Sequence, residues 1–588
     1  MTNCVLAATG YDSWPLALAA GLIAVGAGTA WLLARRGRRR TALFAAAPLL
    51  VVALLASGAG SAAPSFAAEG SGTGTGCATS SPAPVVTPTA PPTTTPVDFQ
   101  PGAAGIGDDY FPLDGNGGYD VQHYDLDLAY DPTTDVLSGT VTITALATQN
   151  LSTFNLDFDT RDVDGTDSIV ISGITVDGTA ADWSLASTQI SADTGQPQAP
   201  GSTDADATPP RTELTVIPVA GITTGSTITT AVTYSGVPFE IDDAFGAAGV
   251  FHTTDGAVIV GQPRVAAAWF PSNDHPSDKA TFSTRMTVPA GLQVVGNGRL
   301  AGQTTDGATT TWDWEMDQPM ATYLATATVG DYQITENEQA GISYYNAIAP
   351  SLFSVTASGG GTTVGDVATS IFNDEPEVID FLSGYFGAYP FSEAGGIAIA
   401  DVHPGPSGYL RYALENQTRP IYPRWAFPAD ADASVVVHEL AHQWYGDSVA
   451  IDRWSDIWLN EGFATYAEWL WEEHEGGDTT AMTAQAVYDD PSDYDDPSAF
   501  WSTVIADPGA AGIFDGATYG KGALTLQALR NEVGDPAFFA IIKGWATDNA
   551  GGNGSTAQFE AYASSVAGTD LTAFFDTWVH SDVKPATL

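Results

Sequence analysis

The hydrophobic period of the chain changes near residue 333, and that change restricts the folds available to it. Between residues 101 and 333 apolar and polar residues alternate, for example over 124–130 and 139–145, which is typical of strands with one buried face. Beyond that point the apolar residues recur with a helical period. Helices are predicted at 364–386, with a break near Pro376, and at 434–445, 461–473 and 521–532. The pattern predicts an α+β protein, with a β-sandwich-like domain over 101–333 and a second domain over 334–588.

The first 68 residues predict a hydrophobic leader. Two apolar stretches, 14–34 and 41–58, flank a cluster of five arginines between Arg35 and Arg40, and each stretch is long enough to span a membrane. Because clustered positive charge stays in the cytoplasm, we expect everything beyond the second stretch to be exported. Small residues over 60–67 suit cleavage by signal peptidase. Retention of the two stretches as a membrane anchor is the alternative.

A second reading of the leader involves the cell wall. Residues 6–10, Leu-Ala-Ala-Thr-Gly, resemble a Gram-positive sorting signal, although such signals lie at carboxyl ends. Because of this position, residues 1–34 are interpreted as the tail of a neighbouring reading frame or as an early start, with the working leader beginning near the arginine cluster. Transient or retained association with the membrane or the cell wall through the leader stands beside simple secretion. From 69 to 100 the chain is rich in Pro, Thr, Ser and Gly, a composition that cannot bury a core and predicts an extended linker. The protein is expected outside the cell or at its surface.

Charge and cysteine content exclude two classes of function. The chain has 19 Lys and Arg against 69 Asp and Glu, a formal charge of −50, so phosphates would be repelled and no nucleic-acid partner is expected. Its two cysteines, Cys4 and Cys77, lie in the leader and the linker. The predicted domains therefore have no thiol for a disulfide, an iron–sulfur cluster or a cysteine nucleophile.

Two histidines in the second domain have the spacing of metal ligands. Residues 438–442 read His-Glu-Leu-Ala-His within a predicted helix. Four residues advance a helix by about 400° and 6 Å, so His438 and His442 leave the same face and can bind one ion. Glu439 is then turned toward a water beside that ion. The alternative is a helix that carries two ordinary core or surface histidines.

A carboxylate completes the set. Eighteen residues separate His442 from Glu461, which is enough for a connection and a second helix. Two His and one Glu, with a fourth position left to water, is the arrangement of a catalytic zinc rather than a structural one. We therefore predict one Zn²⁺ per chain, held by His438, His442 and Glu461, with Glu439 as the general base.

At this point the sequence resembles the gluzincin aminopeptidases, the family of aminopeptidase N and the leukotriene epoxide hydrolase, over residues 119–588. The family signature is His-Glu-x-x-His, eighteen residues, then Glu within Trp-Leu-Asn-Glu-Gly-Phe-Ala, and it is present at 438–442 and 458–464. The resemblance implies a thermolysin-like catalytic domain over 334–588. It also implies a zinc metallo-aminopeptidase, here secreted, that acts on peptide substrates with a free amino terminus.

Many members of that family carry a large helical domain after the catalytic one. This sequence ends soon after the catalytic motifs. We therefore predict a short form of the family, with a more open cleft.

A second family motif, Gly-x-Met-Glu-Asn, resembles residues 412–416, with Tyr in place of Gly and Leu in place of Met. The resemblance implies that Glu415 receives the ammonium group of the substrate, a pairing that a fixed carboxylate favours. It places Ala413, Leu414 and Asn416 beside the substrate. The alternative is that Glu415 pairs with Arg411 or Arg419.

Two further positions follow from the resemblance. The segment Tyr519-Gly520-Lys521-Gly522 resembles the family's Tyr-x-Lys-Gly, which implies that Tyr519 donates a hydrogen bond to the developing oxyanion; an ordinary core tyrosine is the alternative. Residues 269–280 resemble Phe-Pro-Cys-x-Asp-x-Pro-x-x-Lys-Ala. Their register places Gln262 where many members carry a second amine-binding Glu, and this departure leaves the substrate preference open.

Two other functions remain open from the sequence. A zinc endopeptidase would share the metal site but would not need an amine anchor, and Glu415 argues against it. A surface binding module with a relic metal site would not need the general base, yet Glu439 and every other required residue are present.

Overall fold

The computed structural model describes most of the chain from Val97 onward, as one packed unit that ends at Leu588. The predicted leader (1–68) and nearly all of the predicted linker (69–100) lie outside the described residues. Within 97–588 the description omits 163–164, 192–195, 199–209, 244, 401, 403–409, 431–432 and 495. In the ranges that remain, no helix combines the length and the apolarity needed to cross a membrane.

The largest sheet of the first half has eight strands. In order across it they are β15 (Arg299–Asp306), β16 (Thr309–Met320), β13 (Ala280–Pro289), β2 (Tyr119–Asp131), β3 (Val136–Ala147), β9 (Thr227–Gly236), β5 (Ile169–Val176) and β6 (Thr179–Ala180). Along β2, Leu126 and Leu128 are buried whereas Asp125 and Asp127 are exposed. The alternation in the sequence thus becomes one buried and one polar face.

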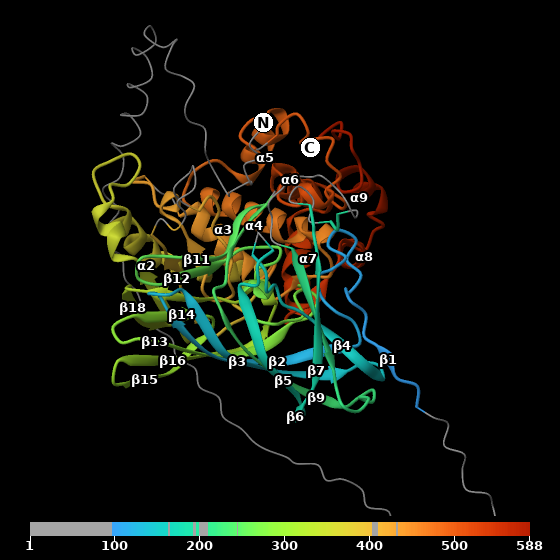
Figure 1. The fold of residues 1–588 in the computed structure, drawn as a ribbon. Coiled ribbons are helices and arrows are strands. Elements are labelled where there is room, and N and C mark those ends of the chain that lie inside the picture. Colours follow the sequence, from blue (N-terminus) through green and yellow to red (C-terminus); the bar gives the residue numbers. More distant parts are fainter. Residues whose placement is uncertain are drawn as a thin grey trace, which may run out of the picture. The chain divides into compact units, whose positions relative to one another are not determined.

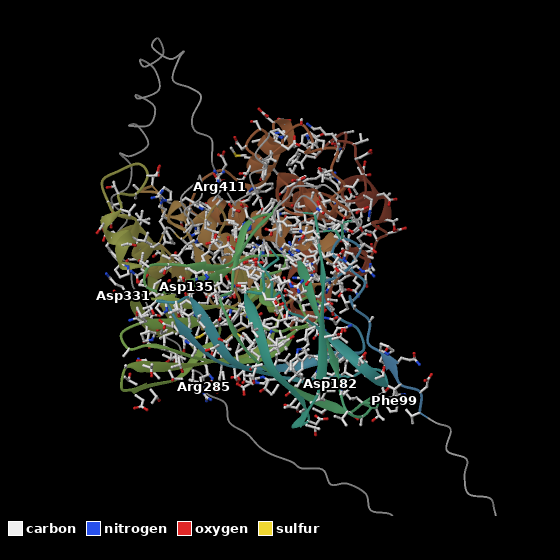
Figure 2. The ribbon with its side chains drawn as sticks, viewed as in Figure 1. Phe99, Asp135, Asp182, Arg285, Asp331 and Arg411 are labelled. Carbon is white, nitrogen blue, oxygen red and sulfur yellow. The ribbon has the colours of Figure 1, made fainter. Side chains whose placement is uncertain are left out.

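Two smaller sheets complete the first half. One has the order β1 (Gln100–Pro101), β4 (Leu151–Asp157), β8 (Arg211–Ile217) and β7 (Asp182–Thr188). The other has the order β10 (Glu240–Asp243), β11 (Gly246–His252), β12 (Ala257–Val260), β17 (Ala327–Gly330) and β14 (Gln293–Gly296). Figure 2 shows exposed charges at the periphery of the first half, among them Asp182 on β7 and Arg285 on β13 of the eight-stranded sheet.

The second half joins a small mixed sheet to a set of helices. The sheet contains β18 (Gln333–Gln339), β19 (Ile342–Ile348), β21 (Ile397–Ala398) and β22 (Ile421–Tyr422), with β20 (Glu393–Ala394) paired to β19. The helices are α2 (Val364–Phe386), α3 (Ser434–His442), α4 (Trp458–His474), α5 (Thr480–Asp489), α6 (Gly516–Val533), α7 (Asp535–Asp548), α8 (Thr556–Ala567) and α9 (Thr572–Trp578). Figure 1 shows these helices, from yellow to red, gathered on one side of the blue and green strands. The predicted α+β fold is confirmed.

The predicted break near Pro376 is wrong, because α2 continues through that residue. A proline inside a helix costs about 3 kcal/mol. The helix also buries Phe372, Val378 and Ile379 against the core, and each such side chain contributes about 1.5–3 kcal/mol. Burial therefore outweighs the loss of one backbone hydrogen bond.

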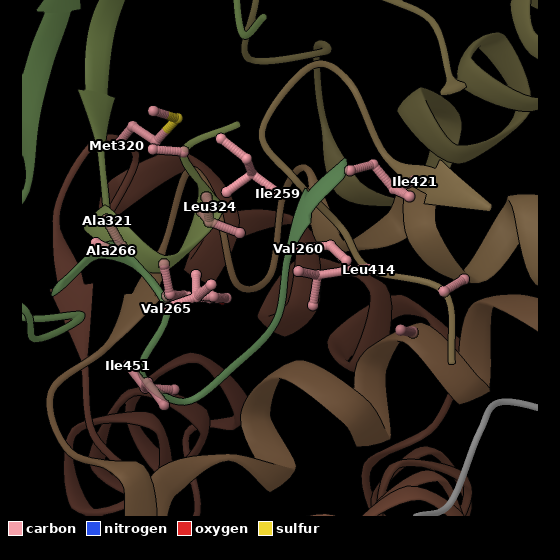
Figure 3. Packing of buried hydrophobic residues seen from close by; sticks show 14 of the residues in the cluster. Ile259, Val260, Val265, Ala266, Met320, Ala321, Leu324, Leu414, Ile421 and Ile451 are labelled. Carbon is pink, nitrogen blue, oxygen red and sulfur yellow. The ribbon is translucent and has the colours of Figure 1, made fainter. Parts of the chain in front are cut away.

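The two halves share one apolar core. Figure 3 shows part of it, with Ile259, Val260, Val265, Ala266, Met320, Ala321 and Leu324 from the first half and Leu414, Ile421 and Ile451 from the second. The predicted boundary at 333/334 falls inside β18, after its first residue. The core, however, runs across that boundary without interruption.

Two cations also cross between the halves, in opposite directions: Lys279, which is partly buried, and Arg419, which is buried. Lys279 of the first half donates hydrogen bonds to the carbonyl oxygens of Asp447 at 2.7 Å and Ser448 at 2.9 Å in the second. Arg419 of the second half donates to the carbonyl oxygens of Gly296 at 3.3 Å and Gly298 at 2.6 Å in the first. These bonds fix the segments that carry the site described next.

Candidate active site

The three predicted metal ligands meet at the crossing of α3 and α4. His438 and His442 lie one turn apart on α3, and Glu461 lies in the first turn of α4. The Oε2 atom of Glu461 is 3.2 Å from His438 Nε2 and 3.4 Å from His442 Nε2. Ligand atoms of a tetrahedral zinc with bonds of about 2.0–2.1 Å are about 3.3 Å apart. The donor set therefore fits one zinc ion.

The other nitrogen of each imidazole is already engaged. His438 Nδ1 lies 2.7 Å from Glu468 Oε1, and His442 Nδ1 lies 3.0 Å from the carbonyl oxygen of Tyr445. Because these acceptors require a proton on Nδ1, each Nε2 keeps its lone pair for the ion. Sequence reasoning missed Glu468, although a residue seven positions after Glu461 on one helix lies on the same face.

We expect Glu468→Gln to weaken zinc binding by about 10–100-fold, because a neutral amide orients His438 less firmly than a carboxylate does. Competition with a zinc chelator, followed by metal analysis, measures the change. Glu472→Gln, at an exposed position of the same helix, is the matched control. Equal zinc affinity in the two variants would contradict an orienting role for Glu468.

Burial and neighbouring charges set the ionisation of the site. Burial opposes ionisation of Glu461, but His442 and His438 outweigh it and lower the pKa of Glu461 to about 2. Burial raises the pKa of Glu439 to about 8, although the same histidines lower it. A cation held by His438, His442 and Glu461 would lower the pKa of Glu439 again, because opposite charge favours the ionised form.

Glu439 is close enough to compete for the same ion. One ligand atom each from Glu415, Glu439 and His442 lie within 4.8 Å of one another, as do those of His438, His442 and Glu461. His442 belongs to both groups, and its Nε2 has a single lone pair. Only one of the two groups can therefore hold an ion at a time.

Glu415 is buried in the wall of the same cleft. Its Oε1 accepts a hydrogen bond of 2.8 Å from the hydroxyl of Tyr323. The side chain of Gln443, directly after α3, donates to the backbone oxygen of Glu415 at 3.1 Å and accepts from the backbone N–H of Thr418 at 2.8 Å. Gln443 thus ties the loop of Glu415 to the helix of the zinc ligands.

Glu415 pairs with neither of the two arginines that were its alternative partners. Arg419 donates to four backbone carbonyl oxygens, those of Gly296, Gly298, Tyr345 and Ala394. Arg411 is exposed at the surface (Figure 2). The carboxylate of Glu415 is therefore left facing the cleft.

The other predicted substrate contacts divide into two groups. Gln262 and Ala413 line the cleft, and Gln262 Oε1 is buried with no hydrogen-bond partner among the described residues. Leu414 and Asn416 are fully buried and are not among the lining residues. Leu414 belongs to the apolar core in Figure 3, and Asn416 Nδ2 donates to the carbonyl oxygen of Leu324 at 2.9 Å. The side chains of these two residues therefore support the loop. The resemblance had placed both residues beside the substrate.

Tyr519 also lines the cleft, in the first turn of α6. Its ring is stacked over the imidazole of His438, with centroids 6.0 Å apart and planes 23° apart. Burial and the nearby carboxylate of Glu461 raise the pKa of Tyr519 well above its usual value. The hydroxyl group therefore stays protonated and can donate a hydrogen bond.

Three aromatic residues of the cleft were not predicted from the sequence. Phe245, Tyr412 and Phe514 line it beside the residues already described. Tyr412 lies in the predicted motif 412–416, but the resemblance gave its side chain no role. Phe245 and Phe514 belong to no motif, so nothing in the sequence alone distinguishes them from other core aromatics.

The geometry defines a zinc metallopeptidase type of centre, and comparisons with known proteins agree. Residues 120–324 match the Peptidase M1 N-terminal domain, and residues 373–578 match the Peptidase family M1 domain. The chain therefore belongs to peptidase family M1.

Among solved structures, the chain is similar to an M1 zinc metallopeptidase from Deinococcus radiodurans, with a TM-score of 0.66 and 28% identity over 82% of this chain and 98% of that one. It is also similar in fold to a yeast LTA4 hydrolase, with a TM-score of 0.60 and 19% identity over 80% of this chain and 69% of that one.

Among curated relatives, aminopeptidase N of Streptomyces lividans is 26% identical over 53% of this chain and 36% of its own length. Aminopeptidase A of Gloydius brevicauda is 28% identical over 54% of this chain and 33% of its own length. The chain thus spans about a third of the length of the curated relatives that it matches.

Proposed function

We propose that this protein is a zinc aminopeptidase that removes residues from the free amino end of peptides. The observation that carries the proposal is the position of Glu415, whose buried carboxylate lies in the same cleft as the metal ligands and within 4.8 Å of atoms of Glu439 and His442. A fixed anion at that distance selects a charged amino group next to the bond to be cleaved. The Deinococcus metallopeptidase, whose variant has been crystallised with a Tyr-Ser-Ala substrate, supports a short peptide as substrate.

Each lining residue has a role in this proposal. His438, His442 and Glu461 would hold one zinc ion per chain, which when bound would supply Lewis-acid polarisation and lower the pKa of the attacking water. Glu439 takes a proton from the attacking water and passes it to the departing amine. Tyr519 donates a hydrogen bond to the oxyanion that develops on the scissile carbonyl.

Glu415 and Gln262 bind the ammonium group of the substrate. The unpartnered Gln262 Oε1 atom can accept one of its hydrogen bonds, which would remove the cost of a buried acceptor without a donor. Because Gln262 is neutral, most of the electrostatic attraction comes from Glu415.

A comparison of free and N-acetylated peptides tests the proposal. We expect single residues to be lost in order from the free amino end of a graded peptide series, as followed by mass spectrometry, and acetylated peptides to resist cleavage. Internal cuts in acetylated peptides would instead support a zinc endopeptidase on the same scaffold. Stable binding of peptides without any cleavage would support a binding module.

We expect Tyr519→Phe to lower kcat by about 100-fold or more while KM changes little, because the hydroxyl acts on the transition state. Steady-state kinetics on an aminoacyl substrate measures both constants. Tyr562→Phe removes a hydroxyl from α8, where it donates to Asp548, and is the control. An unchanged kcat would make Tyr519 an ordinary buried aromatic.

Export is a separate part of the proposal. It depends on the leader of residues 1–68, with a retained membrane or cell-wall attachment as the alternative. Amino-terminal sequencing of protein recovered outside the cell should begin beyond residue 60 if the leader is cleaved. A membrane-bound product that retains Arg35–Arg40 would support the anchor.

A further inference from the structure

The cleft has walls that the proposed chemistry does not use. The zinc ligands, Glu439 and Tyr519 surround the scissile carbonyl, and Glu415 with Gln262 surrounds the ammonium group. The remaining lining residues are Phe245, Tyr412, Ala413 and Phe514. The side chain of the first substrate residue must leave the same carbon atom that carries the ammonium group. These four residues are therefore the surface available to that side chain.

The aromatic part of this surface is packed against further aromatic rings. The rings of Phe245 and Phe514 meet edge to face, with centroids 5.7 Å apart. Behind them, Phe245 packs on Phe111 at 5.8 Å, and Phe111 packs on Trp454 at 6.2 Å. Edge-to-face pairs of this kind contribute about 0.5–1.5 kcal/mol beyond the burial of their area. The two rings of the wall are thus supported by packing from behind.

Tyr412 adds to the same wall without offering a free hydroxyl. Its hydroxyl donates to the carbonyl oxygen of Ala247 on β11 at 2.8 Å. That bond ties the ring to the hairpin of β10 and β11, whose turn carries Phe245. What the wall presents to a substrate is therefore mainly ring carbon.

The cleft also lacks a cation for an acidic side chain. Among the described residues, neither Lys nor Arg lines it, whereas Glu415, Glu439 and Glu461 do. The sequence has no Lys or Arg at the positions after Val97 that the structure leaves undescribed. An acidic first side chain would lose its hydration against aromatic rings, without a partner and beside fixed carboxylates.

We infer that the enzyme prefers an apolar or aromatic first residue, with Phe245 and Phe514 as specificity-determining residues, and that it rejects Asp and Glu at that position. This inference rests on the proposed aminopeptidase function. A well-formed apolar pocket discriminates by about 10–200-fold against a side chain that fills it poorly. An unpaired buried charge should be rejected by about 100-fold or more.

A panel of aminoacyl 4-nitroanilides with Phe, Leu, Ala and Glu tests the inference by kcat/KM on the zinc-loaded full chain. We expect Phe and Leu to exceed Ala by about 10-fold or more, and Glu to be slowest by about 100-fold or more relative to Phe. Phe245→Ala and Phe514→Ala should each lower the Phe-to-Ala ratio by about 10-fold. Trp183→Ala, which truncates an exposed aromatic on β7, should leave the ratio unchanged.

The outcomes separate the inference from the function on which it rests. Equal rates across the panel, or fastest turnover of the Glu substrate, would overturn the inference and leave the aminopeptidase activity intact. Hydrolysis of no member, with zinc bound, would overturn the proposed function and the inference together. If the alanine variants do not fold, Phe514→Leu removes the ring but keeps an apolar side chain in the wall, and the wild-type panel alone still decides the preference.

Discussion

Glu439→Gln should retain its zinc and lose nearly all turnover, by about 10²–10⁴-fold in kcat, the usual contribution of a general base. The three atoms that match a tetrahedral zinc come from His438, His442 and Glu461. Glu439 lies in the cleft outside that set, so its amide should leave the metal in place. An amide of the same shape cannot take a proton from the attacking water.

Metal analysis and steady-state kinetics on the same purified sample measure both expectations. Glu338→Gln, at an exposed position of β18, makes the same chemical change far from the cleft and should keep both zinc and activity. Loss of zinc from Glu439→Gln would place this carboxylate among the ligands. Retained turnover would exclude it as the base.

Glu461→Ala should lose zinc and activity together. The substitution removes the only charged ligand, leaves two neutral imidazoles and opens a second coordination position. It also removes the carboxylate that lies 3.2 Å and 3.4 Å from the two imidazoles, so the histidines lose their mutual orientation.

Zinc content after dialysis against a weak chelator measures this loss, with one zinc per chain expected for the wild type. Thermal unfolding of both proteins with and without added zinc supplies the control, because only the wild type should gain stability from the metal. Full zinc occupancy with normal turnover in Glu461→Ala would remove it from the ligand set.

Local spacing explains why the metal ligands could be predicted. The geometry of a helix places His438 and His442 on one face from their separation alone. Glu461 lies eighteen intervening residues after His442, which leaves room for a connection and a second helix, and the family signature points to the same residue.

The residues that position the site come from distant parts of the chain and could not be predicted. Tyr323 reaches Glu415 from the first half, and Phe245 reaches the cleft from a hairpin turn. Neither contact leaves a periodic pattern or a spacing in the sequence. The continuity of α2 through Pro376 likewise depends on tertiary burial, which outweighs the local preference of proline.

The side chains of Lys279 and Arg419 limit how this enzyme can be divided or recombined. Each cation reaches across the boundary to backbone oxygens of the opposite half. Separating the halves would therefore remove the acceptors of Lys279 named above and two of the four acceptors of Arg419. Peptidase domains of this kind are therefore poor candidates for modular exchange. A chimaera that joins the β half of one relative to the catalytic half of another must match the main-chain positions where the halves meet. Identical side chains at those positions do not ensure that match. Transplanting the loop of residues 415–419 would be harder still, since these residues bond to both halves.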